Sequence, residues 1–292
     1  MLIALDIGGT KLAAARIEGR QILERRQLPM AYDEAGFCRL LDEISSGWDR
    51  SLPLAVAVTG YVDDGLICSV NRDIIPFWNR FPLRQALARY FTSEMVLIND
   101  AQAAAWGEYQ ERKIIRNGQH PADLLFMTLS TGVGGGVVLG HQLRTGTHGL
   151  AGHIGHVGAR LSALDNVMQC GCGAHGCLEL LASGTALARQ ASHLFGCPVT
   201  CPELFAMASG YPVAEHLIAY AAQAVAEAIA GFHMSIDIQE VVIGGSVGLA
   251  DRMLERIRIA LAAMTLPAAP VISGALLGAD AGLLGVAAWM QR

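Results

Sequence analysis

The sequence has no dense run of lysine or arginine, and its formal net charge is −5. Proteins that bind nucleic acid or an anionic lipid surface through electrostatics carry a basic patch or stripe. We therefore expect a small-molecule partner, and neither nucleic acid nor a membrane.

The sequence also lacks a secretory signal and a membrane-spanning pattern. "MLIALDIGGT" (1–10) has no basic segment, and Asp6 interrupts its apolar run. The apolar stretch 216–236 is rich in alanine and contains Glu227, which favours a buried or interface helix over a membrane span. These absences predict a cytoplasmic protein whose mature chain begins at Met1.

Two common nucleotide-binding motifs are missing from the glycine-rich segment 6–11. It matches neither G-x-x-x-x-G-K-[ST], the Walker A loop, nor G-x-G-x-x-G, the Rossmann turn. A phosphate site in this segment must therefore be built differently.

The chain instead contains the same strand plan twice. Segment 2–28 has the pattern of an apolar strand, a Gly-Gly-Thr turn, a second strand, a Gly19-Arg20 turn and a third strand, and segment 123–146 repeats this plan. We interpret the repeat as an internal duplication of an α/β lobe, in which each lobe offers a phosphate-binding turn to a shared cleft.

The length supports two lobes, since 292 residues that are 52% hydrophobic can form two cores. The boundary falls within 112–121, which is polar and ends in proline. The predicted lobes are 1–117, completed by a C-terminal helix over 280–292, and 118–279.

The first glycine-rich turn is "DIGGTK" (6–11). Asp6 ends a strand, and the backbone N–H groups of Gly8, Gly9 and Thr10 can approach phosphate oxygens closely because glycine has no Cβ. A plain hairpin is the alternative, but it does not require an acid beside Gly-Gly-Thr.

Two further glycine-rich segments extend this pattern. "STGVGGG" (130–136) is a second copy of the turn and makes coincidence less credible. "IGGSVGLA" (243–250) could present Gly244 and Gly245 to an adenosine or phosphate at a helix start, although this signal alone is weak.

A candidate catalytic base follows a short apolar strand. Val96–Ile98 precede Asn99 and Asp100, at the carboxyl end of a strand, where open α/β sheets bind ligands. Helix capping explains one polar residue but not the pair. We expect Asp100 to accept a proton from a sugar hydroxyl and Asn99 to hold a neighbouring hydroxyl.

The segment "CGCGAHGCLE" (170–179) concentrates cysteine. The chain has seven cysteines, an odd number, and disulfides are not expected in the cytosol. Cys170, Cys172 and Cys177 supply three sulfurs for a zinc site, and "GHIGH" (152–156) offers the fourth ligand.

Together these motifs resemble the ROK (repressor, ORF, kinase) family of sugar kinases across essentially the whole chain. The resemblance implies the actin/hexokinase-like (ribonuclease H-like) duplicated fold, with a nucleotide and sugar cleft between the two lobes. The matching motifs are Asp6-Ile7-Gly8-Gly9-Thr10-Lys11, Asn99-Asp100, Thr131-Gly132-Val133-Gly134-Gly135-Gly136, Gly155-His156 and Cys170-x-Cys172-x4-Cys177-x-Glu179.

The resemblance implies a role for each motif. It implies that Asp100 is the catalytic base, and that a structural Zn²⁺ is bound by His156, Cys170, Cys172 and Cys177. It implies that Asn99, His156 and Glu179 contact the sugar. It implies that ATP phosphates with Mg²⁺ are held by the two turns, Asp6, Gly8, Gly9, Thr10, Lys11, Thr131, Gly132, Val133, Gly134, Gly135 and Gly136.

The chain departs from the family pattern at His153, where the family usually has glutamate. An imidazole can both accept and donate a hydrogen bond, whereas a carboxylate only accepts, so the sugar pocket must differ. This departure argues against glucose as the substrate. The segments "GLAGHIGH" (149–156), "INDAQAAAW" (98–106) and "VVIGGSVGLA" (241–250) resemble family members that phosphorylate an amino sugar on its 6-hydroxyl, and this resemblance implies the same reaction here. In the loop 59–83, Gly60 and Asn71 are further sugar-binding candidates by this resemblance.

Three alternatives compete with this interpretation. ROK repressors carry a DNA-binding helix-turn-helix ahead of the first glycine turn, which here begins six residues from the start. A noncatalytic sugar-binding module leaves Asp100 and the two turns unexplained. A glucokinase or N-acetylglucosamine kinase is the serious rival.

Alanine- and glycine-rich helices suggest a homodimer.

Overall fold

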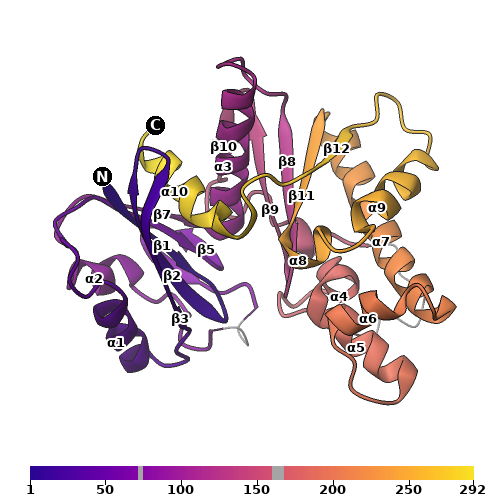
Figure 1. Cartoon of the computed structure of the whole chain (residues 1–292), viewed down its shortest axis with the longest axis horizontal. Helices are drawn as coiled ribbons and strands as arrows, with labels where there is room; N and C mark the ends of the chain where they lie inside the picture. Colours follow the sequence, from indigo (N-terminus) through magenta and orange to yellow (C-terminus); the bar gives the residue numbers. More distant parts are fainter. Residues whose placement is uncertain (72–74, 160–167) are drawn as a thin grey trace. The chain divides into compact units, whose positions relative to one another are not determined.

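The computed structural model describes residues 1–71, 75–159 and 168–292 (Figure 1). It contains two compact units. Unit 1 comprises Met1–Gln119, Leu143–Ala151 and Ala279–Arg292, and unit 2 comprises His120–Gln142 and Gly152–Gly278. Part of the predicted sugar loop, 72–74, and part of the predicted second lobe, 160–167, lie outside the described residues.

The segment Leu143–Ala151 differs from the predicted boundaries, which assigned it to the second lobe. Its attachment to unit 1 has a local cause. The buried Gln102 side chain donates from Nε2 to the carbonyl oxygens of Gly149 at 3.1 Å and Ala151 at 2.8 Å.

Unit 1 is built on a five-stranded sheet in the order β3-β2-β1-β4-β7. The strands are β1 Leu2–Ile7, β2 Lys11–Glu18, β3 Gln21–Pro29, β4 Leu54–Val58 and β7 Met95–Asn99. β1 pairs antiparallel with β2 and parallel with β4, which pairs parallel with β7. The carboxyl ends of β1, β4 and β7 therefore meet at one edge of the sheet.

Unit 2 has the same sheet plan, with the order β10-β9-β8-β11-β12. Its strands are β8 Leu124–Leu129, β9 Val133–Leu139, β10 Gln142–Arg144, β11 Glu240–Gly244 and β12 Val271–Gly274. β8 pairs antiparallel with β9 and parallel with β11, which pairs parallel with β12. The repeated topology confirms the predicted duplication, and the mixed α/β architecture confirms the predicted fold class.

Helices pack on both sheets. Unit 1 has α1 Glu34–Ile44, α2 Leu83–Ala88, α3 Asp100–Ile115 and α10 Ala281–Met290, together with the hairpin β5 Tyr61–Asp63 and β6 Leu66–Cys68. Unit 2 has η1 Ile154–His156, α4 Glu179–Ala182, α5 Gly184–Phe195, α6 Cys201–Met207, α7 Pro212–Ile236, α8 Gly245–Gly248 and α9 Met253–Ala262.

The apolar periodicity explains how each unit forms its core. β4 is buried along its whole length, as expected for a strand covered on both faces. Each unit has its own cluster of buried aliphatic and aromatic side chains. The predicted C-terminal helix is α10, which packs against α3, β1 and β4 of unit 1.

Among the described residues, α7 is long and apolar enough to cross a membrane by length and composition, and 50% of that stretch is buried. Its buried face is made mostly of alanine and branched aliphatic side chains. A long core helix passes the same test.

Candidate functional site

Asn99 and Asp100 lie where β7 gives way to α3. The Asn99 side chain caps the helix, because its Oδ1 accepts from the backbone N–H of Gln102 at 3.0 Å. Its Nδ2 donates to the Gly60 carbonyl oxygen at 2.8 Å and to Asp100 Oδ1 at 3.0 Å. Both amide hydrogens of Asn99 are thus engaged within unit 1, so this residue holds Asp100 and the predicted sugar loop together.

The Asp100 carboxylate is half-buried and held in one orientation. Oδ1 also accepts from the backbone N–H of Ala101 at 2.8 Å, which leaves Oδ2 as the oxygen without these bonds. Burial raises the pKa of Asp100 above its ordinary value. A carboxyl group with a raised pKa is a better proton acceptor once it is ionised, as a general base must be.

Asp6 is the second acid at this edge of the sheet. It lies in β1, where its register partners are the small residues Ala13 and Ala57. Burial, and next the charge of Asp100, raise the pKa of Asp6 to about 7. Lys11 and Arg25 act in the opposite direction, and Asp280 in the same direction. Two carboxylates that influence each other in this way offer the oxygen ligands that a divalent cation prefers.

The first glycine turn connects β1 to β2. The backbone N–H of Gly8 donates to the Lys11 carbonyl oxygen at 2.9 Å and closes the turn, so this N–H does not face a phosphate as predicted. The part of the chain that the structure describes contains no protein acceptor for the N–H groups of Gly9 and Thr10. These two remain the candidate phosphate donors.

The second turn, Ser130–Gly132, is oriented by the start of α5. The carbonyl oxygen of Ser130 accepts from the Gly184 N–H at 2.7 Å, and that of Thr131 accepts from the Thr185 hydroxyl at 2.9 Å. In a trans peptide the N–H points opposite to the carbonyl. The N–H groups of Thr131 and Gly132 therefore point away from α5, where two adjacent donors can meet an anion.

The rest of this predicted turn belongs to a strand. Val133, Gly134, Gly135 and Gly136 lie in β9, so the prediction that the turn extends over 130–136 is corrected to 130–132. Glycine is needed at position 135 for packing, because a Cβ there would lie 2.7 Å from the Gly152 carbonyl oxygen.

The same close approach places His156. A Cβ on Gly155 would lie 2.2 Å from the Val133 carbonyl oxygen, and one on Gly152 would lie 2.9 Å from the Gly136 Cα. The segment 152–156 therefore rests directly on the β9 backbone. Its two imidazoles, His153 and His156, lie with their ring planes 21° apart and their centroids 6.5 Å apart.

Glu179, at the start of α4, is tied to the second turn. Its Oε2 accepts from the Val133 N–H at 3.0 Å, and a Cβ on Gly132 would lie 2.7 Å from this oxygen. The family resemblance assigned Glu179 to the sugar and gave no sign of this contact. Glu179 Oε2 thus holds the second turn in place.

We expect Glu179→Ala to weaken nucleotide binding by about 10-fold, because hydrogen bonds to charged groups contribute about 1.5–3 kcal/mol. Glu179→Gln is the matched control, since its amide oxygen can still accept from Val133. Calorimetric titration with ADP distinguishes them. Equal ADP affinity in the alanine variant and the unaltered protein would show that the turn does not depend on this bond.

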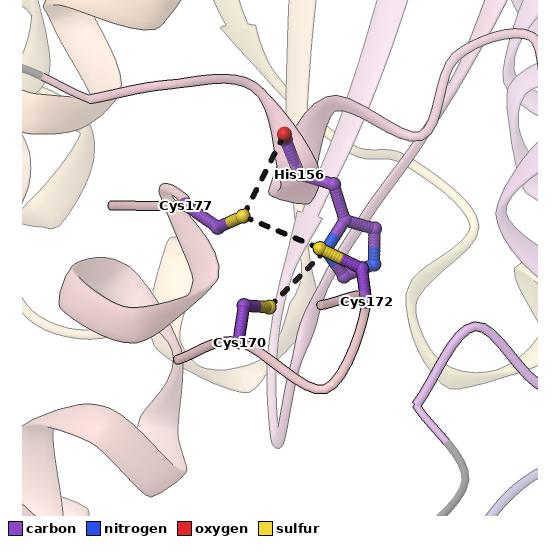
Figure 2. A group of neighbouring side chains, drawn as sticks. All are labelled: His156, Cys170, Cys172 and Cys177. Atoms are coloured by element: carbon purple, nitrogen blue, oxygen red, sulfur yellow. Dashed lines mark hydrogen bonds between the residues drawn. The ribbon is translucent and has the colours of Figure 1, made fainter. Parts of the chain in front are cut away.

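His156, Cys170, Cys172 and Cys177 converge on a common centre in unit 2 (Figure 2). Their ligand atoms all lie within 4.8 Å of one another. His156 Nδ1 is 3.5 Å from Cys170 Sγ, and the sulfurs of Cys172 and Cys177 are 3.5 Å apart. Figure 2 shows the second imidazole nitrogen directed away from the three sulfurs.

This donor set fits Zn²⁺. Three sulfurs and one imidazole nitrogen at these separations match a tetrahedral ion with Zn–S bonds of about 2.3 Å and Zn–N bonds of about 2.0–2.1 Å. Burial raises the pKa values of Cys170 and Cys177, and a cation at the centre would reverse this by stabilising the thiolates. Four protein ligands leave no open position, so the ion would be structural.

The backbone around the cluster joins two segments of the chain. Leu178 N–H donates to the Val157 carbonyl oxygen at 3.0 Å, and Ala159 N–H donates to that of Gly176 at 2.9 Å. The cluster thereby connects the segment ending in His156 to the one that leads into Glu179. All seven cysteines are free thiols, and Cys38, Cys68, Cys197 and Cys201 are not among the clustered ligands.

Three further predicted residues, Gly60, Gly244 and Gly245, are glycines that close packing requires. A Cβ on Gly244 would lie 3.0 Å from the Phe126 ring, and one on Gly245 would lie 2.2 Å from the Leu129 carbonyl oxygen. Gly245 has a φ of +85° and starts α8 beside the second turn. Gly60 has a φ of +91°, and a Cβ there would lie 2.4 Å from the Cys68 carbonyl oxygen.

Sequence reasoning missed the residues that hold these groups in place. Gln102 contacts the loop 145–151, and Thr185 contacts the second turn. The start of α10, around Gly282, contacts Asp6. Gln102 gave one available signal, as a polar side chain within an alanine-rich helix. The other two act through contacts distant in sequence.

The chain matches the family model "ROK family" over residues 2–292. It is 39% identical over 298 residues to the N-acetylmannosamine kinase of Salmonella heidelberg (strain SL476), covering 99% of this chain and 98% of that protein. Among solved structures, the ROK hexokinase of Thermus thermophilus is 34% identical, with a TM-score of 0.79 over 98% of this chain and 96% of that one.

A ROK family glucokinase from Streptomyces griseus, solved with glucose and AMPPNP, is 29% identical, with a TM-score of 0.82 over 100% of this chain and 99% of that one. The protein belongs to the ROK family and has the actin/hexokinase-like fold of its sugar kinases. The predicted resemblance is therefore confirmed.

Proposed function

We propose that the protein is an ATP-dependent kinase of N-acetyl-D-mannosamine. The reaction transfers the γ-phosphoryl group of ATP to the sugar 6-hydroxyl and yields N-acetylmannosamine 6-phosphate and ADP. This reaction would serve sialic acid breakdown. The observation that carries the proposal is the oriented, half-buried Asp100 carboxylate beside Asp6, in a chain 39% identical to an N-acetylmannosamine kinase.

Asp100 accepts the proton of the sugar 6-hydroxyl as that oxygen attacks the γ-phosphorus, and the bond to the β-phosphate oxygen breaks. Its orientation is set by Ala101 N–H and Asn99 Nδ2. General-base assistance of this kind contributes about 10²–10⁴-fold to the rate.

Two turns bind the phosphates. The N–H groups of Gly9 and Thr10 in the first turn, and of Thr131 and Gly132 in the second, donate to phosphate oxygens, while Lys11 adds positive charge. When bound, Mg²⁺ would supply positive charge that offsets the charge on the transferred group. The half-buried Asp6 carboxylate would hold this ion, consistent with a cation that uses one or two carboxylates plus substrate phosphates.

The sugar is recognised by a set of polar groups. His156 donates from its second imidazole nitrogen, and Glu179 accepts through its second oxygen. His153 takes the place of the usual family glutamate and meets the sugar with a group that can donate as well as accept. The loop residues Gly60 and Asn71 complete the set. His156 would be held in orientation by Zn²⁺ bound together with the three cysteines. We expect the active protein to be a homodimer in the cytoplasm.

A coupled assay of ADP release on N-acetylmannosamine, N-acetylglucosamine, glucose, fructose and mannose tests the substrate. We expect N-acetylmannosamine to give the highest kcat/KM, because a site built to pair specific hydroxyl and amide groups rejects sugars that leave those groups unpaired. A higher kcat/KM for glucose or N-acetylglucosamine would replace this assignment with the rival kinase. Without phosphorylation of any sugar, the proposed activity fails.

A further inference from the structure

The side chain of Asp6 rests against the start of the C-terminal helix. A Cβ built on Gly282, the second residue of α10, would lie 2.6 Å from Asp6 Oδ2 and 3.0 Å from its Cγ. Any other residue at position 282 would displace this carboxylate, because Gly282 is buried within the helix and its backbone cannot easily retreat.

The same helix lies equally close to α3. A Cβ on Gly285 would lie 1.9 Å from the Ala103 carbonyl oxygen, three residues beyond Asp100. Two glycines one turn apart therefore allow α10 to touch both the strand that carries Asp6 and the helix that begins at Asp100. The packing of Trp289 edge-on against Trp106 of α3, with ring centroids 5.5 Å apart, holds the far end of α10 on the same partner.

An ion pair anchors the residue that precedes α10. Arg25 Nε of β3 donates to Asp280 Oδ1 at 2.8 Å. Both side chains are only one-third exposed, so their geometry is better defined than that of a fully solvated pair. Four charged groups act on the pKa of Asp6: Asp100 and Asp280 raise it, and Lys11 and Arg25 lower it.

We propose that the start of α10, Asp280–Gly282, is a positioning element of the phosphoryl-transfer site. Its close contact with the Asp6 carboxylate keeps this group in the orientation that the bound metal–nucleotide requires. This inference rests on the proposed function, which gives Asp6 its part in holding Mg²⁺. Gly282 does not touch the reactants and acts through Asp6.

The test is Gly282→Ala in the full-length protein. We expect kcat to fall by about 10–100-fold, since misplacing a site by about 1 Å can cost 10²-fold. The Mg²⁺ concentration for half-maximal rate should rise, while the sugar KM stays within about twofold, because the sugar-binding groups are not moved. A purely structural role would lower Tm and leave these kinetic constants unaltered.

Gly231→Ala is the matched control. Gly231 lies in α7, and a Cβ there meets nothing within 4 Å. This variant should keep the kinetics of the unaltered protein and melt at the same or a higher temperature, because alanine is about 1 kcal/mol more favourable than glycine in a helix. It separates the Asp6 contact from the general effect of replacing a helical glycine.

Arg25→Met keeps the proposal falsifiable if Gly282→Ala does not fold. It removes the anchor of Asp280 without adding bulk, and we expect a several-fold fall in kcat and a raised requirement for Mg²⁺. Asp6→Asn is the reference. If Asp6→Asn abolishes turnover while Gly282→Ala or Arg25→Met keeps the normal kcat and Mg²⁺ dependence, the positioning role is overturned and the proposed function stands. If the unaltered protein phosphorylates no sugar, the proposed function itself fails.

Discussion

Asp100→Asn is expected to lower kcat by about 10²–10⁴-fold, because the amide cannot accept the proton of the attacking hydroxyl. Sugar binding should survive. The amide oxygen that replaces Oδ1 can still accept from Ala101 N–H, so the local geometry at the start of α3 is retained. Steady-state kinetics for kcat and calorimetry for the sugar Kd separate the two effects.

Asp237→Asn is a suitable control for this variant. Asp237 is an exposed residue at the C-cap of α7 with a φ of +53°, a conformation that asparagine also adopts readily. Its turnover should equal that of the unaltered protein. Normal turnover in Asp100→Asn would remove Asp100 from the role of base.

The pH dependence of the same variant gives a second readout. Burial raises the pKa of Asp100, and burial with the charge of Asp100 raises the pKa of Asp6 to about 7. As pH falls through these raised values the carboxylates take up protons, so kcat/KM of the unaltered protein should decline on the acid side from near neutrality. The limb that belongs to Asp100 should be absent from Asp100→Asn.

The raised pKa of Asp100 affects stability in the opposite direction to activity: activity falls as pH falls, whereas stability falls as pH rises. The folded protein binds more protons than the unfolded chain between the ordinary carboxyl pKa and the raised pKa, so its stability falls as pH rises through the raised value. A neutral amide escapes this loss. Asp100→Asn should therefore melt at the same or a higher temperature than the unaltered protein at pH 8, even though its kcat is much lower.

The topology could be predicted from the sequence because local patterns determine it. Apolar runs and glycine turns recur in both halves of the chain, and the two sheets have the same strand order. The change from strand to helix at Asn99 is likewise a local pattern. The cysteine spacing likewise indicated a metal cluster, because C-x-C-x4-C brings its sulfurs together through local backbone turns.

The glycines of 134–136 show where such reasoning ends. Adjacent glycines suggested a phosphate turn, but they lie in β9, where Gly135 and Gly136 make room for the segment 152–156. A phosphate-binding turn and a strand that another segment approaches closely both require residues without a Cβ, so composition alone does not distinguish the two. The contacts of Glu179 with Val133 and of Gly282 with Asp6 join residues 46 and 276 positions apart, which only the folded chain reveals.

The second large effect is expected from loss of the zinc ligands. Cys172→Ser should abolish stoichiometric zinc, lower Tm by several degrees and weaken sugar binding by at least about 10-fold. The physical reason is that a structural Zn²⁺ adds its binding free energy to the stability of the folded state. When the ion is lost, the three remaining clustered donors have no common partner. Without the metal, His156 loses its fixed ring orientation, and the segment that leads into Glu179 loosens with it.

Cys197→Ser is the matched control for this change, since Cys197 is exposed and lies outside the cluster. It should retain zinc, Tm and sugar affinity. Metal content is measured by elemental analysis, Tm by calorimetry and sugar Kd by titration, before and after treatment of the unaltered protein with a chelator. The backbone bonds of Leu178 and Ala159 hold the two segments together without metal, so a partial loss of affinity on chelation is expected before unfolding. A zinc-free protein with unaltered sugar Kd would show that these bonds alone position His156 and Glu179, and that the metal has no part in the sugar site.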